Sequence, residues 1–154
     1  RAMENIHARD LYKPLTSAVI QRQTPVLGIC LGMQLLAGFG HEDGGAAGLG
    51  WIPGDVVAFC FDDPAVRIPH IGFNNVYAAK APSRLIDTAA TANDFYFVHG
   101  YHFRCDDERD VTAWCDYHGP FVASVERGNV FGTQFHPEKS QANGLRVLAR
   151  FLRT

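Results

Sequence analysis

Among the residues of this chain, Cys30 has the sequence surroundings most typical of a catalytic nucleophile. It lies in Pro25-Val-Leu-Gly-Ile-Cys-Leu-Gly-Met-Gln34, an apolar run that is typical of a buried strand and turns into a helix at the thiol. A nucleophile at such a turn needs small neighbours, here Gly28 and Gly32, because a Cβ at either place would clash. The N-terminus of the helix would favour the reactive thiolate. A buried structural cysteine beside two turn glycines fits the run equally well.

A candidate base for this thiol stands near the other end of the chain. His136 follows an alternating pattern over 129–135, which predicts a strand that ends at the histidine. Glu138 is two residues further on, and residues i and i+2 of an extended backbone project to the same side, so its carboxylate can orient the imidazole. Taken alone, such a pair is more often solvated or capping. Combined with the turn around Cys30, it predicts a Cys-His-Glu triad for nucleophilic catalysis.

Apolar spacing predicts the elements that position these residues. Helical patterns cover 3–21, where Pro14 is expected to divide the helix, and 31–38 behind the nucleophile. A third amphipathic helix is predicted for 140–152, with Leu145, Leu148 and Leu152 on its buried side. The glycine-rich segment 40–50 is expected to form a mobile loop.

Strand patterns alternate with turn residues through the rest of the chain. The predicted strands are 25–29, 55–59, 74–78, 95–99, 111–115, 121–127 and 130–135. Without a domain-sized linker, residues 1–154 are expected to form a single α/β domain with a parallel core sheet and a β-rich second half.

Composition narrows the classes of function. The chain has 154 residues and a formal net charge of −2, which shows no bias toward nucleic acid. The longest apolar stretch, 25–40, is interrupted by glycines and Gln34 and is too short to predict a membrane span. The cysteines lack paired metal spacing, so we expect reduced thiols, no metal and no cofactor in a cytoplasmic protein. They are Cys30, Cys60, Cys105 and Cys115.

The chain resembles the triad-type, or class-I, glutamine amidotransferases, and within them the glutaminase subunits of imidazole glycerol phosphate synthases. The resemblance spans nearly all of the chain and implies an open, mainly parallel sheet flanked by helices, as in flavodoxin-like folds. Its motifs are Gly28-Ile-Cys-Leu-Gly-Met-Gln34, Gly48-Leu-Gly50, Pro69-His-Ile-Gly-Phe-Asn74, Tyr96-Phe-Val-His99 and Gly132-Thr-Gln-Phe-His-Pro-Glu-Lys-Ser-Gln141.

The resemblance also implies a segment upstream of Arg1. The family has an earlier strand, helix and strand there, and a Pro-Gly-x-Gly turn that supplies part of the oxyanion hole. Pro53-Gly54 cannot replace that turn, because it follows the nucleophile and lacks the second glycine. We therefore expect the glutaminase domain of this chain to be incomplete at its N-terminus.

The family implies roles for residues around the nucleophile. The N–H of Leu31 would donate to the oxyanion, and Gln34, one helical turn after Cys30, would reach bound glutamine. A substrate-holding turn is expected at His99-Gly100-Tyr101. Gly100 replaces the serine usual in the family, so a hydroxyl contact is lost while a backbone contact remains available.

The family further implies a partner, a barrel-shaped cyclase subunit that receives ammonia through an internal channel within a heterodimer. Residues expected at this interface are His70, Phe73, Asn74 and Lys139. Phe73 stands where tryptophan is usual, and Lys139 by itself reads as a solvated lysine. Two alternatives remain: a paralogous ammonia donor for a surface-sugar amidotransferase, and a non-catalytic regulatory docking subunit. The intact Cys30, His136 and Glu138 argue against the second alternative.

Overall fold

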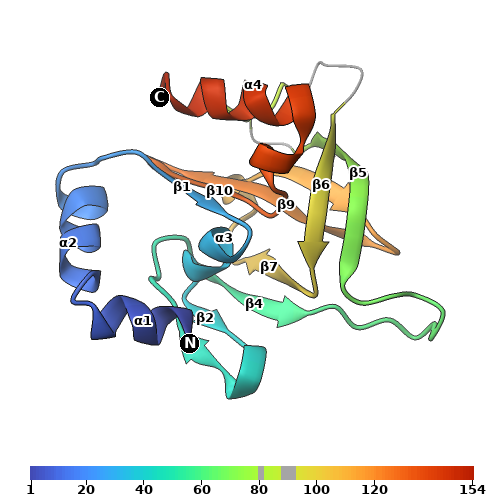
Figure 1. Ribbon diagram of the computed structural model, residues 1–154, viewed down its shortest axis with the longest axis horizontal. Helices are drawn as coiled ribbons and strands as arrows, with labels where there is room; N and C mark the ends of the chain where they lie inside the picture. Colours follow the sequence, from blue (N-terminus) through green and yellow to red (C-terminus); the bar gives the residue numbers. More distant parts are fainter. Residues whose placement is uncertain (80–81, 88–92) are drawn as a thin grey trace.

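A six-stranded mixed sheet forms the centre of the computed structural model, which describes residues 1–79, 82–87 and 93–154 (Figure 1). In spatial order its strands are β1 (Val26–Ile29), β10 (Val130–Thr133), β9 (Pro120–Arg127), β8 (Val111–Asp116), β5 (His70–Ala78) and β6 (Asp94–His99). β1 and β10 are parallel, and the remaining neighbours in this order are antiparallel.

The expectation of a mainly parallel sheet is therefore wrong. A parallel pair needs a long crossover connection, usually a helix, whereas antiparallel strands need only a tight turn. The chain passes from β8 to β9 through residues 117–119 and from β9 to β10 through residues 128–129. These connections are too short for crossovers. The mixed sheet with helices still makes the fold α/β.

A second, four-stranded sheet packs beside the first. Its spatial order is β3 (Ala46–Ala47), β2 (Phe39–Gly40), β4 (Gly54–Ala58) and β7 (Tyr101–Cys105). The sequence patterns missed β7, which begins immediately after β6 and leaves the large sheet for the small one. The glycine-rich segment 40–50 is also more regular than expected, since it holds β3, the end of β2 and the 3₁₀ turn η2 (Glu42–Gly44).

The helices are short. They are α1 (Ala2–Ala8), α2 (Tyr12–Thr16), the π-helical η1 (Ser17–Gln21), α3 (Leu31–Leu35) and α4 (Gln141–Phe151), with 3₁₀ turns η3 (Glu108–Asp110) and η4 (Pro137–Lys139). The first predicted helix does divide, but at residues 9–11 rather than at Pro14. Pro14 lies in the first turn of α2, where its missing N–H would have no helical partner.

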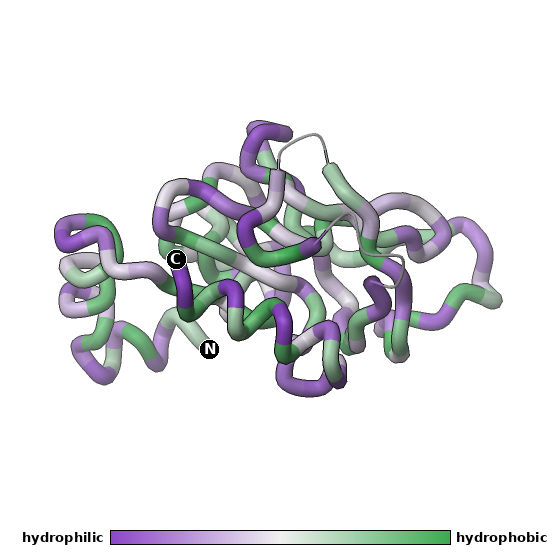
Figure 2. The backbone as a smooth tube through the Cα atoms, turned by 90° about the horizontal axis from the view of Figure 1, so that it is seen from above, coloured by the Kyte–Doolittle hydropathy of each residue, from purple (hydrophilic) through white to green (hydrophobic). Residues whose placement is uncertain are grey.

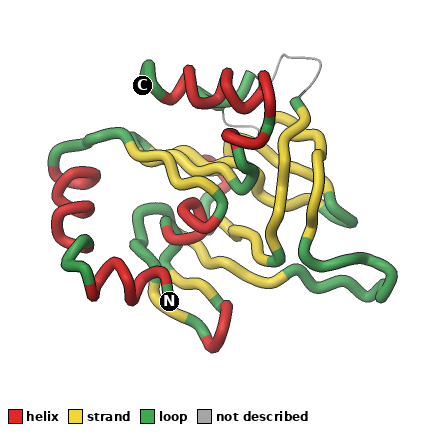
Figure 3. The backbone as a smooth tube through the Cα atoms, in the orientation of Figure 1, coloured by secondary structure: helices red, strands yellow, loops and turns green. Residues whose placement is uncertain are grey.

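The large sheet carries a hydrophobic core on each face. In Figure 3, α4 lies on one side of its strands and α3 on the other. Residues of β9 contribute to both cores: Phe121 and Ala123 belong to the core beneath α4, and Val122 belongs to the core beneath α3 and the small sheet. Val125 joins the second core and departs from strict alternation where the pairing of β8 with β9 shifts register. Figure 2 shows hydrophilic residues interleaved with hydrophobic ones along the chain, as expected when elements bury one side. Packing on both faces thus fixes the positions of the strand ends of the large sheet.

The buried side of α4 differs from the prediction. Leu145 and Leu152 are 67% and 83% exposed, whereas Gly144 and Val147 are buried. Close packing on η4 sets this rotation, because a Cβ on Gly144 would lie 1.7 Å from the carbonyl oxygen of Pro137. The helix therefore packs through Gly144 directly against the segment that carries His136 and Glu138.

Candidate active site

Cys30 occupies a strained turn between β1 and α3. Its φ of 49° and ψ of −106° lie in a region that residues with a Cβ rarely adopt. Its N–H donates to the carbonyl of Thr133 at 2.7 Å, and its own carbonyl accepts from the N–H of Gln34 at 3.1 Å. The turn is held at both ends, as the predicted nucleophile elbow requires.

The two glycines of the elbow are not equivalent. A Cβ on Gly28 would lie 2.6 Å from the carbonyl carbon and oxygen of Gly32, so Gly28 lets α3 cross close over β1. A Cβ on Gly32 would meet nothing within 4 Å. The prediction that a Cβ would clash is confirmed for Gly28 and is wrong for Gly32. The backbone of Gly32 lies against the position of a Cβ on Gly28, whereas a Cβ on Gly32 would point into open space.

The Cys30 thiol is half-buried and held by weak polar contacts. Its Sγ lies 3.9 Å from the carbonyl oxygen of Val98, toward which the S–H points, and accepts from Nε2 of Gln134 at 3.7 Å. Burial raises the pKa of this thiol; the Leu31 N–H lowers it, and the Glu138 carboxylate raises it further. The expected bias toward the thiolate is therefore outweighed by desolvation, and the thiol needs a base.

The expected orienting contact of the base is present. Nδ1 of His136 lies 2.7 Å from Oε1 of Glu138. A carboxylate accepts, so Nδ1 carries the proton and Nε2 is the basic nitrogen. Within the described part of the chain Nε2 of His136 is buried and makes no hydrogen bond. The imidazole thus offers one free lone pair on a nitrogen atom that is itself buried, while the Glu138 side chain beside it is half exposed.

Parallel pairing of β1 with β10 brings the thiol and the imidazole to one edge of the sheet. Ile29 pairs with Thr133, and Cys30 and His136 follow these paired residues along their chains. The His136 N–H donates to the carbonyl of Tyr96 at 2.8 Å, which ties the end of β10 to β6. No hydrogen bond joins Cys30 to His136 among the described residues, so proton transfer requires the two side chains to move closer together.

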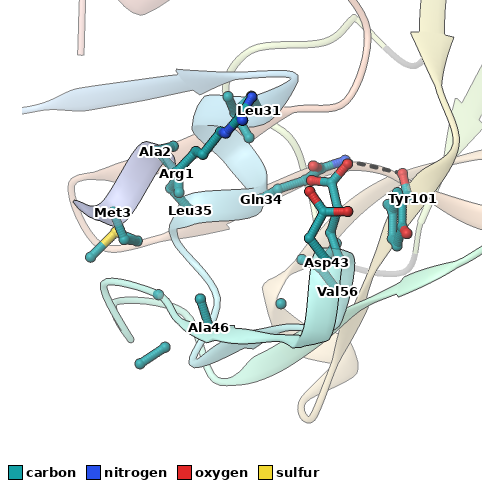
Figure 4. Close-up of a pocket in the computed structure, with 14 residues that line it drawn as sticks. Arg1, Ala2, Met3, Leu31, Gln34, Leu35, Asp43, Ala46, Val56 and Tyr101 are labelled. Atoms are coloured by element: carbon teal, nitrogen blue, oxygen red, sulfur yellow. Dashed lines mark hydrogen bonds between the residues drawn. The ribbon is translucent and has the colours of Figure 1, made fainter. Parts of the chain in front are cut away.

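A cavity of about 290 Å³ opens next to the nucleophile, lined by Leu31, Gln34, Asp43, Val56 and Tyr101 among others (Figure 4). The amide nitrogen of Gln34 donates to the carbonyl of Tyr101 at 3.0 Å and to Oε1 of Gln134 at 3.2 Å. Both of its protons are therefore engaged. Gln34 and Tyr101 both line this cavity, and their contact with a substrate stays a prediction.

His99 does not fit a substrate contact through its ring. The imidazole is buried; its Nδ1 donates to the carbonyl of Tyr101 at 2.8 Å, and its Nε2 lies 3.3 Å from Nδ1 of His70. The ring instead holds the turn that follows β6, and a substrate contact through the backbone of this turn stays a prediction. Gly100 forms that turn, and a Cβ there would lie 3.3 Å from the side chain of Ile68, a tight but not prohibitive contact for the family's serine.

The residues expected at a partner interface separate into two groups. The His70 side chain is buried against Phe97 and Tyr117, so it cannot make a surface contact, contrary to our expectation. The amide of Asn74 donates to the carbonyl of Asp116 at 2.7 Å.

Phe73 is 48% exposed and packs edge-on against Tyr96, and the ammonium of Lys139 lies 5.7 Å above the same Tyr96 ring. Phe73, the half-buried Tyr96 and Lys139 therefore form one row at the surface, hereafter the aromatic row.

Sequence reasoning missed Gln134. Its side chain is fully buried and lies between Gln34 and Cys30. The available signal was a polar residue directly after β10, between the apolar Phe131 and Phe135.

Comparison with known proteins decides the family. The family model described as glutamine amidotransferase class-I matches residues 6–154. The chain belongs to this family. The family's enzymes hydrolyse glutamine, and the glutamine amidotransferase assignment agrees with the thiol, imidazole and carboxylate described above.

Its relatives include imidazole glycerol phosphate synthase subunits HisH. The chain is 45% identical to that of Ruegeria pomeroyi over 94% of this chain and 68% of the relative. It is 47% identical to that of Rhodopirellula baltica over 97% and 71%, and 40% identical to that of Leptospira interrogans over 97% and 73%. The chain thus spans roughly two thirds of each relative's length or slightly more.

Solved structures agree on the fold. A crystal structure described as a glutamine amidotransferase superposes with a TM-score of 0.68 at 17% identity, covering 96% of this chain and 69% of the other. A glutamine amidotransferase from Thermotoga maritima superposes with a TM-score of 0.57 at 17% identity, covering 95% and 52%. At these identities the likeness speaks for the fold alone.

The described residues contain no helix of the length and apolarity that crossing a membrane would take. Within the same residues, no three side chains of histidine, cysteine, aspartate or glutamate gather closely enough to hold a metal ion.

Proposed function

We propose that this amidotransferase hydrolyses glutamine through Cys30, His136 and Glu138 and passes the ammonia to a synthase partner that forms imidazole glycerol phosphate. The observation that supports this most is the His136–Glu138 hydrogen bond of 2.7 Å, beside a strained Cys30 at the end of a neighbouring parallel strand. Relatives named as HisH subunits at 40–47% identity support the histidine-pathway role.

The first half of the reaction transfers the glutamyl group to sulfur. Nε2 of His136 takes the thiol proton, and the thiolate attacks the side-chain carboxamide carbon of glutamine. The resulting tetrahedral oxyanion would accept from the Leu31 N–H, which already faces Sγ. His136 then gives its proton to the departing nitrogen, so the C–N bond breaks, ammonia leaves and a thioester remains on Cys30.

The second half regenerates the thiol. His136 removes a proton from water, whose oxygen attacks the thioester carbonyl. The C–S bond breaks, the sulfur takes back the proton, and glutamate leaves. Throughout, Glu138 keeps Nδ1 protonated and stabilises the transient imidazolium. A second oxyanion donor, expected upstream of Arg1, stays a prediction.

Gln34 has a defined way to recognise glutamine. Both protons of its amide nitrogen are committed to Tyr101 and Gln134, so Oε1 is the atom that it can offer. An amide oxygen accepts, and it would suit the ammonium group of glutamine in the adjoining cavity. The carboxylate of Asp43, which points into the same cavity in Figure 4, would add attraction for that charge.

The aromatic row is the surface that we propose for the partner subunit. Phe73 and the ring of Tyr96 supply an apolar anchor, and Lys139 supplies a cation one residue from Glu138. Aromatic side chains are enriched at such interfaces, and a charge at the rim, as Lys139 would supply, steers the partner and sets its orientation. Docking there can adjust the backbone of the triad directly.

The deciding experiment is to mix the protein with its proposed cyclase partner and measure glutamate release and imidazole glycerol phosphate formation. Cys30→Ala is expected to abolish product formation with glutamine and to leave it intact with ammonium salts. Loss of both activities would contradict a donor role.

Glutamate release that feeds a sugar-modifying enzyme but not the cyclase would favour the surface-sugar alternative. Failure of any partner to elicit glutamate release would favour a non-catalytic docking subunit.

A further inference from the structure

We propose that Gln134 acts directly on the nucleophile: its side-chain amide, fixed by Gln34, keeps an N–H donor on Cys30 Sγ. This inference rests on the proposed role of Cys30, which it deepens. Gln134 touches the reacting atom, and it belongs to neither the triad nor the expected oxyanion hole.

The orientation of the two amides follows from one obligate acceptor. The carbonyl of Tyr101 cannot donate, so the group of Gln34 that lies 3.0 Å from it must be the nitrogen (Figure 4). The second proton on that nitrogen points at Gln134, 3.2 Å away, so the facing atom of Gln134 must be Oε1. This leaves Nε2 of Gln134 on the sulfur, 3.7 Å away.

A second donor steadies the same carbonyl. Nδ1 of His99 donates to Tyr101 at 2.8 Å, which leaves Nε2 of His99 as an acceptor for Nδ1–H of His70 at 3.3 Å. Burial lowers the pKa of both imidazoles to about 4, so both are neutral near pH 7 and keep these tautomers. The carbonyl that fixes Gln34 is therefore itself held in place.

Such a donor stabilises the thiolate more than the thiol, because a charged sulfur accepts more strongly than a neutral one. The charged groups around Cys30 are Glu138, which raises the thiol pKa, and Lys139, which lowers it; His136 is the neighbouring base. Burial and the Glu138 carboxylate both oppose ionisation of the thiol. A hydrogen-bond donor that is already in place stabilises the thiolate without any rearrangement of the site. Gln134 is fully buried, so it is pre-organised in that sense.

The test is the pH profile of Cys30 alkylation by iodoacetamide, read by peptide mass spectrometry. This reagent needs neither glutamine nor a partner. Gln134→Met keeps the side-chain length and removes the donor, and it should raise the midpoint for Cys30 by about one pH unit, slowing alkylation about tenfold at pH 7. The exposed Cys60 in the same samples should keep its profile and serves as the internal reference.

The matched control is Thr112→Val, which deletes another buried polar contact, the 3.2 Å bond between Thr112 and Ser124, two residues in the described part of the chain, neither of which hydrogen-bonds to Cys30. It should lower the melting temperature without moving the Cys30 midpoint. An unchanged midpoint in folded Gln134→Met would overturn the proposal.

A second variant covers the case in which Gln134→Met does not fold. Gln34→Met frees the Gln134 amide to turn over and should raise the Cys30 midpoint by a smaller amount; no shift there would equally overturn it. Failure of the proposed function is separate, because it would appear as absent glutamate release from the parent protein with its partner, whatever the alkylation profiles show.

Discussion

The Glu138 carboxylate lies 2.7 Å from Nδ1 of His136, and a single residue, Pro137, separates the two in the sequence. The φ of −98° and ψ of 97° at His136 are extended, and the 3₁₀ turn η4 then folds Glu138 back beside the ring. The pair is therefore local in sequence, and its geometry depends on the turn that α4 supports from behind.

Replacement of Glu138 tests this pair. Glu138→Gln keeps the size of the side chain and removes its charge, so both the Nδ1–H tautomer and the imidazolium lose support. We expect the kcat of glutamate release to fall by about 10²-fold or more, with a smaller change in KM. Glu138→Asp keeps the charge at a greater distance from the ring, and its kcat should lie between those of the parent and of Glu138→Gln. Equal rates for the parent and Glu138→Gln would remove Glu138 from the mechanism.

The two elbow glycines give opposite expectations. Gly28→Ala places a Cβ 2.6 Å from the Gly32 backbone, and we expect it to lower the free energy of unfolding by about 1–3 kcal/mol and to disturb Cys30. Gly32→Ala meets open space inside α3, so stability should be unchanged or higher by up to about 1 kcal/mol. Urea unfolding of both variants measures this contrast, and similar losses for the two would contradict it.

The buried imidazoles predict acid sensitivity. The pKa of His70 and of His99 is about 4 in the folded protein, against 6.5 as the ordinary value, so the unfolded chain binds more protons between these limits. Their contribution to stability is complete above pH 6.5 and is lost as the pH falls toward 4, on the order of 3 kcal/mol for each.

His70→Phe should flatten this dependence, because one of the two titrating rings is removed. The exposed His7, changed to Gln, is the control and should leave the slope as it is. Urea midpoints between pH 4 and 7 provide the measurement. A parent protein whose stability does not vary over this range would show that the two rings are not buried in solution as described.

Truncation within the aromatic row tests the partner surface. Phe73→Ala removes an exposed anchor that packs on Tyr96, and we expect the Kd for the cyclase partner to rise by about 10- to 100-fold. Lys139→Ala should weaken binding less and reduce the stimulation of glutaminase activity by the partner's ligand, a coupling of about 1–3 kcal/mol.

The control for this experiment is Leu152→Ala, which truncates another exposed apolar side chain, directly after the C-terminus of α4. Its Kd, measured by calorimetry alongside the others, should match that of the parent. Equal losses for Phe73→Ala and Leu152→Ala would place the interface elsewhere.

The sequence by itself determined the local features of this site. The strand-to-helix turn at Cys30, the need for glycine at position 28 and the i, i+2 relation of His136 to Glu138 depend on residues that are neighbours along the chain. Backbone sterics and side-chain alternation fix such relations over a few residues. Most strands were predictable for the same reason, since their apolar periodicity is local.

The tertiary structure decided what joins distant residues. The direction of the strands depends on which connections form crossovers, and the buried side of α4 depends on the approach of Gly144 to Pro137. The chain of contacts from Tyr101 through Gln34 and Gln134 to Cys30 spans three separate parts of the sequence. Hydrogen-bond partners and desolvation come from packing, which is why the raised pKa of Cys30 and the buried place of His70 could not be predicted from neighbouring residues.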